Sequence, residues 1–243
     1  MNFYASIIGS EILNGRRVDK HFEFLKDELN RYGHELFASF IIKDDEDLIK
    51  NIYKLIKDDK NSVLFSFGGI GSTPDDLTRA IAAEIFTSQP LQRNKKFEED
   101  IIDRFAKEAY PHRIHMSDLP QNSKLIFNPI NNMSGFSLED RYFFVPGFPQ
   151  MAHPMISSII ESLFPEAVKK HRLTIIAQTS ENTLISLMKQ VPSDIELSSL
   201  PTLNENGVSV EISLCATDKL HVSEYFKLFT EHLDNSNIKY NLI

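Results

Sequence analysis

A glycine-rich stretch, FSFGGIGSTPDDLT at residues 65–78, combines backbone freedom, hydroxyl groups and two adjacent carboxylates directly after an apolar run. Glycines allow a backbone to approach a ligand closely, and the exposed amides of such a loop can bind phosphate oxygens. Asp75 and Asp76 supply the oxygen ligands that Mg²⁺ prefers. The alternative is a tight turn in which the two acids only favour the first turn of a helix.

Two common phosphate-binding motifs do not fit this loop. A P-loop needs a lysine followed by Ser or Thr at the end of its glycine run, and GGIGSTPDD contains no lysine. The dinucleotide fingerprint G-x-G-x-x-G begins at Gly69 and Gly71 but has Pro74 at its third glycine position. That fingerprint also belongs after the first strand of a sheet, whereas this loop follows the third.

The elements around the loop alternate between strands and helices. Apolar runs predict strands at 3–9, 35–43, 62–68 and 142–146, and helical spacing predicts helices at 18–32, 48–56, 93–109 and 150–164, with another beginning near Pro74 or Asp75. This order predicts an α/β fold with a mostly parallel sheet and crossover helices on both faces.

The residues that follow these strands carry the chemistry. Glu11 follows the first strand, Asp44 the second, the glycine-rich stretch the third, and PGFP at 146–149 the last. Because ligands bind beyond the carboxyl ends of parallel strands, we expect these segments to meet at one edge. His21 opens the next helix near that edge. The alternative is that Asp44 and Asp45 start a helix and that Glu11 is a surface charge.

Residues 166–243 show a different order of predicted strands and helices. Strands are predicted at 172–178, 194–200 and 208–216 and in the terminal IKYNLI, helices at 181–191 and 219–233, and a turn at 204–207. The order β-α-β-β-α-β predicts a small ferredoxin-like α+β domain. With a boundary at Pro165, the expected domains are residues 1–165 and 166–243.

Composition sets limits on the function. The 243 residues carry a net charge of −8, which argues against a nucleic-acid partner. No apolar run approaches the roughly 20 residues that span a membrane, and the N-terminus does not resemble a signal peptide. We therefore expect a cytoplasmic protein without membrane contact. The single cysteine, Cys215, lies in an apolar strand-like run and is expected to be buried and inert.

Four blocks in order resemble one known family. GSEILNGRRVDKH, IIKDDEDLI, GGIGSTPDDLT and PGFP are similar to the motifs of the MoaB/MogA-type molybdopterin-binding domain, in the form found at the N-terminus of CinA (competence/damage-inducible) proteins. The resemblance covers about residues 4–165 and implies a three-layer α/β/α sandwich. The tail resembles the KH-like domain that follows in CinA proteins, and we expect no deamidase domain after it.

The resemblance implies two activities. Some relatives bind molybdopterin, and others resemble metal-dependent pyrophosphohydrolases that act on ADP-ribose or related dinucleotides. It implies acidic functional residues at Asp44 and Asp76 and a phosphate loop at Gly69, Gly71 and Thr73. Three departures stand out: Ser10 replaces an acid, Lys20-His21 replaces Thr-Asn, and residues 131–133 replace a Gly-Thr-Ala stretch.

Our leading hypothesis is therefore cleavage of a nucleotide pyrophosphate with Mg²⁺, Mn²⁺ or Co²⁺ held by Glu11, Asp44 and Asp76. The alternative is a non-hydrolytic protein that holds molybdopterin or a nucleotide at the same edge. A KH-like RNA site in the tail is disfavoured, because residues 166–243 contain only Gly207 and no G-x-x-G loop. We expect a homo-oligomer. The expected phosphate- or ligand-binding residues are Gly68, Gly69, Gly71, Ser72, Thr73, Asp75, Lys20, His21, Pro146 and Gly147.

Overall fold

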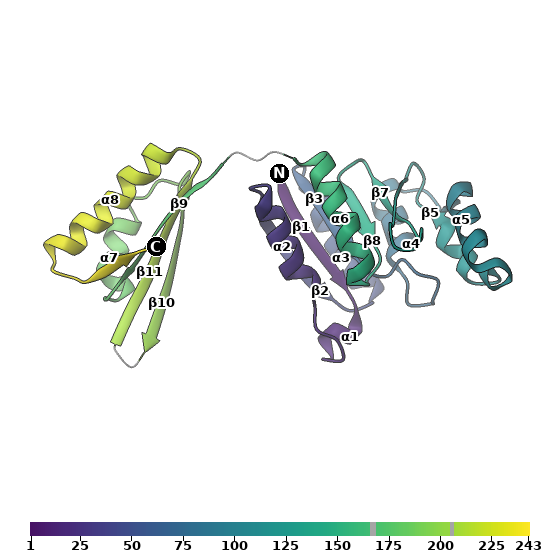
Figure 1. The fold of residues 1–243 in the computed structure, drawn as a ribbon, viewed down its shortest axis with the longest axis horizontal. Helices are drawn as coiled ribbons and strands as arrows, with labels where there is room; N and C mark the ends of the chain where they lie inside the picture. Colours follow the sequence, from purple (N-terminus) through teal and green to yellow (C-terminus); the bar gives the residue numbers. More distant parts are fainter. Residues whose placement is uncertain (166–168, 205–206) are drawn as a thin grey trace. The chain divides into compact units, whose positions relative to one another are not determined.

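The computed structural model describes residues 1–165, 169–204 and 207–243. The chain divides into two compact units, Met1–Ala167 and Val168–Ile243 (Figure 1). The boundary expected at Pro165 adjoins residues 166–168, and the turn expected at 204–207 includes 205–206; these residues lie outside the described part of the chain. In the described residues, no helix combines the length and apolar character needed to cross a membrane.

The first unit is built on a six-stranded sheet with the order β2-β1-β3-β8-β7-β6. Its strands are β1 (Asn2–Ile8), β2 (Leu36–Ile42), β3 (Ser62–Phe67), β6 (Lys124–Ile126), β7 (Gly135–Leu138) and β8 (Tyr142–Val145). The first four strands in the spatial order are parallel. At the β6 edge, β7 pairs antiparallel with β8, and β6 pairs antiparallel with β7. The predicted mostly parallel α/β sheet is confirmed.

Strand register brings the carboxyl ends of the parallel strands together. Ile8 pairs with Ile42, Ile7 with Phe67, and Phe67 with Val145. The segments that leave β1, β2, β3 and β8 therefore start at the same edge of the sheet. This register is what brings residues that are distant in sequence to one site.

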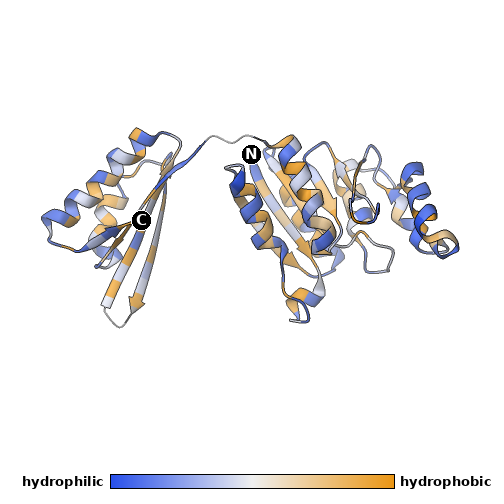
Figure 2. Ribbon diagram, in the orientation of Figure 1, coloured by the Kyte–Doolittle hydropathy of each residue, from blue (hydrophilic) through white to orange (hydrophobic). Residues whose placement is uncertain are grey.

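Helices cover both faces of this sheet, which makes three layers. Along β1, Phe3, Ala5 and Ile7 pack in a core with α2 (His21–Arg31) and α6 (Pro149–Leu163). Tyr4 and Ile8 pack in the opposite core with α3 (Glu46–Asp58) and α4 (Thr78–Ala82). The strands of the sheet are coloured largely as apolar, whereas the covering helices mix polar and apolar residues (Figure 2). The strands need apolar residues on both faces because both faces are covered.

The remaining elements of the first unit flank this core. They are α1 (Ser10–Leu13), a π-helical segment η1 (Ala83–Thr87), β4 (Gln92–Arg93), α5 (Lys95–Phe105), two 3₁₀ segments, η2 (Ala106–Ala109) and η3 (Arg113–Ser117), and β5 (Asp118–Leu119). The sequence did not predict α1, β6 or the antiparallel β7.

Two of the helices differ from the predictions at boundaries that local contacts explain. The helix expected to begin near Pro74 or Asp75 begins at Thr78, because the amides of Asp76 and Leu77 form local turns with Thr73 and Asp75. The helix expected at 93–109 spans only Lys95–Phe105. Its start is fixed by the Asn94 side chain, which accepts a hydrogen bond from Phe97, and Ala106 ends it with a positive φ of 47°.

The second unit has the predicted β-α-β-β-α-β order. It contains β9 (His171–Ala177), α7 (Glu181–Met188), β10 (Glu196–Asn204), β11 (Gly207–Ala216), α8 (Lys219–Asn235) and β12 (Tyr240–Leu242). The strands form an antiparallel sheet in the order β10-β11-β9-β12. Residues of α7 and α8, including Leu184, Phe226 and Phe229, share one apolar core with this sheet. The ferredoxin-like prediction is confirmed.

Candidate functional site

A cavity of about 550 Å³ is formed by the segments that follow β1, β2, β3 and β8. Gly9 and Glu11 come after β1, Asp44 after β2, and Pro146 and Gly147 after β8. The segment after β3 contributes the largest continuous wall, which we call the glycine loop (residues 68–76). The cavity therefore lies at the edge where the sequence placed the site.

The structure brings most of the sequence-predicted site residues to this cavity. Those that line it are Glu11, His21, Asp44, Gly68, Gly69, Gly71, Ser72, Thr73, Asp75, Asp76, Pro146 and Gly147. Lys20 does not line it. That residue directly precedes α2, makes no side-chain capping hydrogen bond and is exposed to solvent. The chemical roles assigned to these residues stay predictions.

Close backbone contacts fix the start of the glycine loop. Gly68 has a φ of +96°, and a Cβ at this position would lie 2.5 Å from the carbonyl oxygen of Ile8. Thr78 at the start of α4 holds the loop from the other side: its hydroxyl donates to Gly68 O and its amide to Gly69 O, both at 3.0 Å. Only glycine satisfies this conformation and this close approach together.

Four consecutive amides of the loop have no acceptor. Within the described residues, the N–H groups of Gly69, Ile70, Gly71 and Ser72 donate to no protein atom. All four residues line the cavity. Such a run of adjacent donors forms an anion-binding concavity, because backbone N–H groups carry partial positive charge. The loop can therefore bind the oxygens of a phosphate group.

The acids beside the loop are held by hydrogen bonds. Oδ2 of Asp76 accepts from the amide and the hydroxyl of Thr73, both at 2.7 Å. The Thr73 hydroxyl also contacts Asp75, and this hydrogen bond lowers the pKa of the Asp75 carboxyl. Both acids are therefore oriented by the loop itself and not by a helix terminus.

The acids after β1 and β2 have different surroundings. Oδ2 of Asp44 accepts from the amide and the hydroxyl of Ser10, both at 2.9 Å, which ties the ends of β1 and β2 together. Glu11 lies 4.0 Å from the guanidinium of Arg17, in a half-exposed ion pair. The serine at position 10 thus contacts the carboxylate that the sequence assigned to a metal.

These acids fit a divalent metal as one or two ligands and not as a closed set. In the part of the chain that the structure describes, Glu11, Asp44 and Asp76 do not gather their oxygens within 4.8 Å of one another. Oδ1 of Asp44 and Oδ1 of Asp76 accept no hydrogen bond from the described residues. Mg²⁺ is commonly held by one or two carboxylates together with the phosphates of a substrate, which suits these oxygens.

His21 connects two walls of the cavity. It is only 3% exposed, stacks on Phe67 with ring centroids 4.4 Å apart, and its Nε2 donates to the carbonyl of Gly147 at 3.3 Å. Burial lowers the pKa of His21, although the hydrogen bond to Gly147 and the charge of Asp19 oppose this effect. A neutral imidazole therefore holds the 146–148 turn beside the glycine loop.

An apolar wall also lines the cavity, and sequence reasoning missed most of it, although PGFP at 146–149 includes Phe148 and the departure at 131–133 includes Met133. It consists of Phe97, Phe105, Met116, Met133, Phe148 and Met151. The guanidinium of Arg113 lies 4.5 Å from the centroid of the Phe105 ring. The apolar spacing of Phe97 and Phe105 predicted inward positions on a helix, but no sequence signal placed them at a ligand cavity. Such a wall can pack against the planar ring of a ligand.

Comparisons with known proteins agree with this architecture. Residues 5–166 match the model of a family described as "Probable molybdopterin binding domain". A CinA-like protein of Geotalea daltonii is 28% identical over 227 residues, which cover 88% of this chain and 54% of that protein. A CinA-like protein of Acaryochloris marina is 31% identical over 155 residues, covering 61% of this chain and 36% of that protein. The chain thus spans about half the length, or less, of these relatives.

One solved structure has the same fold. It is the crystal structure of the protein CinA with unknown function from Thermoplasma acidophilum, which is 24% identical. The match covers 66% of this chain and 96% of that chain, with a TM-score of 0.59. At this identity the similarity supports the fold and not a shared activity.

Proposed function

Since this chain belongs to the family of molybdopterin-binding domains and is similar to CinA-like proteins, we propose a function for the cavity. The proposed function is hydrolysis of a nucleotide pyrophosphate with the help of a divalent metal ion. The observation that carries the proposal is the run of four acceptor-free amides at Gly69–Ser72, in the same cavity as Asp44 and Asp76. The substrate class is ADP-ribose or a related dinucleotide.

Each wall of the cavity has a role in this proposal. The loop amides bind and orient the phosphate oxygens, and the apolar wall packs against a planar ring of the substrate. Asp44 and Asp76 would hold the cation, since the Oδ1 atom of each carboxylate accepts no hydrogen bond from the described residues. When bound, the metal ion offsets phosphate charge and lowers the pKa of the attacking water. The water oxygen would form the new P–O bond as the bridging P–O bond breaks. The leaving phosphate would keep the electron pair of the broken bond, and the proton of the water would pass to solvent.

The test is direct turnover. The purified chain is incubated with ADP-ribose, FAD and NAD in the presence of Mg²⁺, Mn²⁺ or Co²⁺, and the mononucleotide products are separated by chromatography. At least one substrate and metal pair should be cleaved, and Asp76→Asn should lose most of the activity. Asp58→Asn is the matched control, since Asp58 is exposed and does not line the cavity. Absence of turnover with every pair, or full turnover in Asp76→Asn, rejects hydrolysis.

A second function is favoured by one specific observation. Because Oδ2 of Asp44 is occupied by two hydrogen bonds from Ser10, the chain has fewer ready metal ligands at this edge than a site with an acid at position 10. We therefore propose binding of molybdopterin or a nucleotide without hydrolysis as the alternative. Pterin fluorescence in the purified protein, or a thermal shift by a nucleotide that is recovered uncleaved, distinguishes this alternative from the enzyme.

A further inference from the structure

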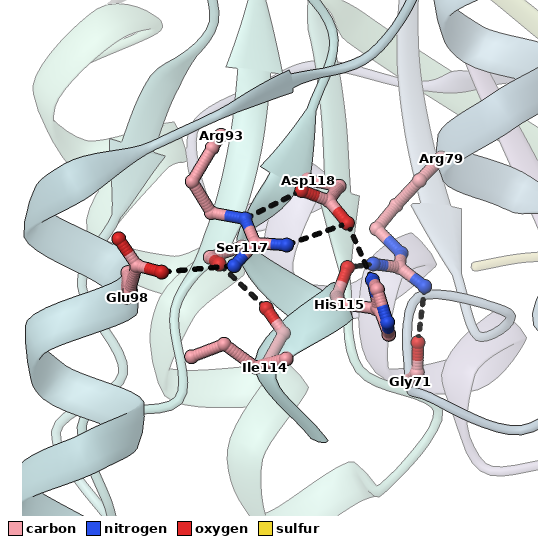
Figure 3. Close-up of polar contacts among 8 residues, drawn as sticks. All are labelled: Gly71, Arg79, Arg93, Glu98, Ile114, His115, Ser117 and Asp118. Carbon is pink, nitrogen blue, oxygen red and sulfur yellow. Dashed lines mark hydrogen bonds and ion pairs between the residues drawn. The ribbon is translucent and has the colours of Figure 1, made fainter. Parts of the chain in front are cut away.

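Arg79 is a buried arginine behind the glycine loop. It belongs to α4, is 8% exposed and does not line the cavity. One guanidinium nitrogen, Nη2, donates to the carbonyl of Gly71 at 2.5 Å, and Nη1 donates to the carbonyl of His115 (Figure 3). Both acceptors of this buried cation are main-chain oxygens, and in the described residues it makes no ion pair within 4.0 Å.

His115, whose carbonyl accepts from Arg79, is held in place by its own side chain. Its Nδ1 bonds to Asp118 at 2.8 Å, and Asp118 accepts from Arg93 Nε at 2.6 Å. Arg93 also donates to Glu98 on α5 at 2.8 Å. These contacts link η3, β4, β5 and α5 into one cluster beside Arg79 (Figure 3). The guanidinium of Arg79 therefore joins the glycine loop to this hydrogen-bonded cluster.

Peptide geometry converts this contact into a constraint on the cavity. The carbonyl of Gly71 and the amide of Ser72 belong to one planar trans peptide, so the C=O and N–H bonds point in opposite directions. When Arg79 holds the Gly71 carbonyl on its own side, the Ser72 N–H must point away from Arg79. Ser72 lines the cavity, and its amide has no acceptor in the described part of the chain.

The charge of Arg79 favours the same ligand. Burial lowers the pKa of Arg79, but the charges of Asp76 and Asp118 oppose the effect, and an arginine stays protonated at neutral pH. Neither carboxylate forms an ion pair with Arg79 within 4.0 Å, so the positive charge behind the loop is only partly balanced. An anion on the loop amides would lower the energy of this arrangement, because the low dielectric of the interior strengthens the attraction.

We infer that Arg79 is the positioning residue of the glycine loop, which fixes the Ser72 amide toward the cavity and selects an anionic ligand group. The inference rests on the proposed function, since it takes the phosphate of the substrate as the bound anion. It adds a residue outside the cavity and outside the glycine loop to the recognition of that phosphate.

The test uses the full chain, inorganic pyrophosphate as the probe, and three variants. Arg79→Met keeps most of the side-chain length but removes the charge and both hydrogen bonds, and Arg79→Lys keeps the charge but cannot bridge both carbonyls. Arg141→Met is the matched control. Arg141 also donates to two main-chain carbonyls, of Ser62 and Asp59 at 3.0 Å, but it lies outside the cavity lining. Affinity is measured by calorimetry, and the order of the Ser72 amide by ¹⁵N relaxation.

The expected result is a loss of pyrophosphate affinity in the variants that lose the contact between Arg79 and the Gly71 carbonyl. Arg141→Met should bind pyrophosphate like the wild type, Arg79→Met at least tenfold more weakly, and Arg79→Lys between the two. The Ser72 amide should become mobile in Arg79→Met while the amides of β3 keep their relaxation. A purely structural role would affect the whole unit and would not be rescued by lysine.

Two results overturn the inference. One is wild-type affinity and an unchanged Ser72 amide in Arg79→Met; if that variant does not fold, the same result in Arg79→Lys has the same meaning. The other is an equal loss of affinity in Arg141→Met. If the wild type itself does not bind pyrophosphate, the proposed function fails, while mobility of Ser72 in the Arg79 variants still decides whether Arg79 positions the loop.

Discussion

Replacing Gly68 with alanine tests whether the glycine loop depends on close backbone contact. Gly68 has a φ of +96°, and the new Cβ would lie 2.5 Å from the carbonyl oxygen of Ile8. This oxygen belongs to the backbone at the end of β1 and cannot rotate away. Gly15 is the matched control because it has a φ of +77°, and a Cβ added there would meet no atom of the described residues within 4 Å.

The two substitutions share one cost and differ in another. A side chain in the left-handed region costs roughly 1–2 kcal/mol, so Gly15→Ala should lose about that amount of stability. Gly68→Ala adds an overpacking cost of roughly 1–3 kcal/mol, so its total should be about 2–5 kcal/mol. For a unit of 150–250 residues, the additional loss corresponds to a melting temperature roughly 2–12 °C lower than that of Gly15→Ala.

Scanning calorimetry is the appropriate assay because the chain has no tryptophan and contains two compact units. The transition of the first unit should move in both variants and more in Gly68→Ala. If Gly68→Ala melts at or above the temperature of Gly15→Ala, the loop does not depend on the contact with Ile8, and the account of its rigid start is wrong.

Three further predictions concern two buried groups, His21 and Cys215, and the half-buried Asp118. Burial lowers the pKa of His21, so as the pH falls the unfolded chain takes up a proton at this residue before the folded chain does. The urea midpoint of unfolding should therefore fall as the pH drops below roughly 6.5. In His21→Gln the midpoint should fall less. Burial acts to raise the pKa of Asp118, but the hydrogen bonds and charges of Arg93 and His115 outweigh it and lower the pKa. Asp118→Asn should therefore lower the free energy of unfolding by about 1–2 kcal/mol at neutral pH. The difference from the wild type, measured by urea unfolding, should shrink as the pH falls through the lowered pKa of Asp118. Cys215 is 3% exposed, so its thiol should react with Ellman's reagent slowly in the native chain and at once in urea.

The fold was predictable because its signals are local. Successive residues of the first strand, such as Phe3 and Tyr4, pack in two different cores on opposite faces of the sheet. The strand therefore appears in the sequence as a continuous apolar run. Parallel strands then place the following segments at one edge, which is why the glycine loop, Asp44 and Glu11 line one cavity. The helix start at Thr78 was missed because turns at residues 73–77 satisfy the amides that a helix would have used.

The parts of the site that the sequence did not show depend on contacts between distant segments. Arg79 reads as an ordinary basic residue of a helix, but in the structure it is buried and donates to the carbonyl of His115 in η3. The partner of Asp44 depends on how β1 and β2 end, and it proved to be Ser10. The apolar wall combines α5 with residues near Met116 and Met133, a combination that no spacing in the sequence indicates.

The most direct test of the central claim is a crystal structure of this chain with pyrophosphate or ADP-ribose bound. The account predicts phosphate oxygens at hydrogen-bond distance, about 2.7–3.2 Å, from the amide nitrogens of Gly69–Ser72. A phosphate bound elsewhere, with those four amides facing only water, would contradict it.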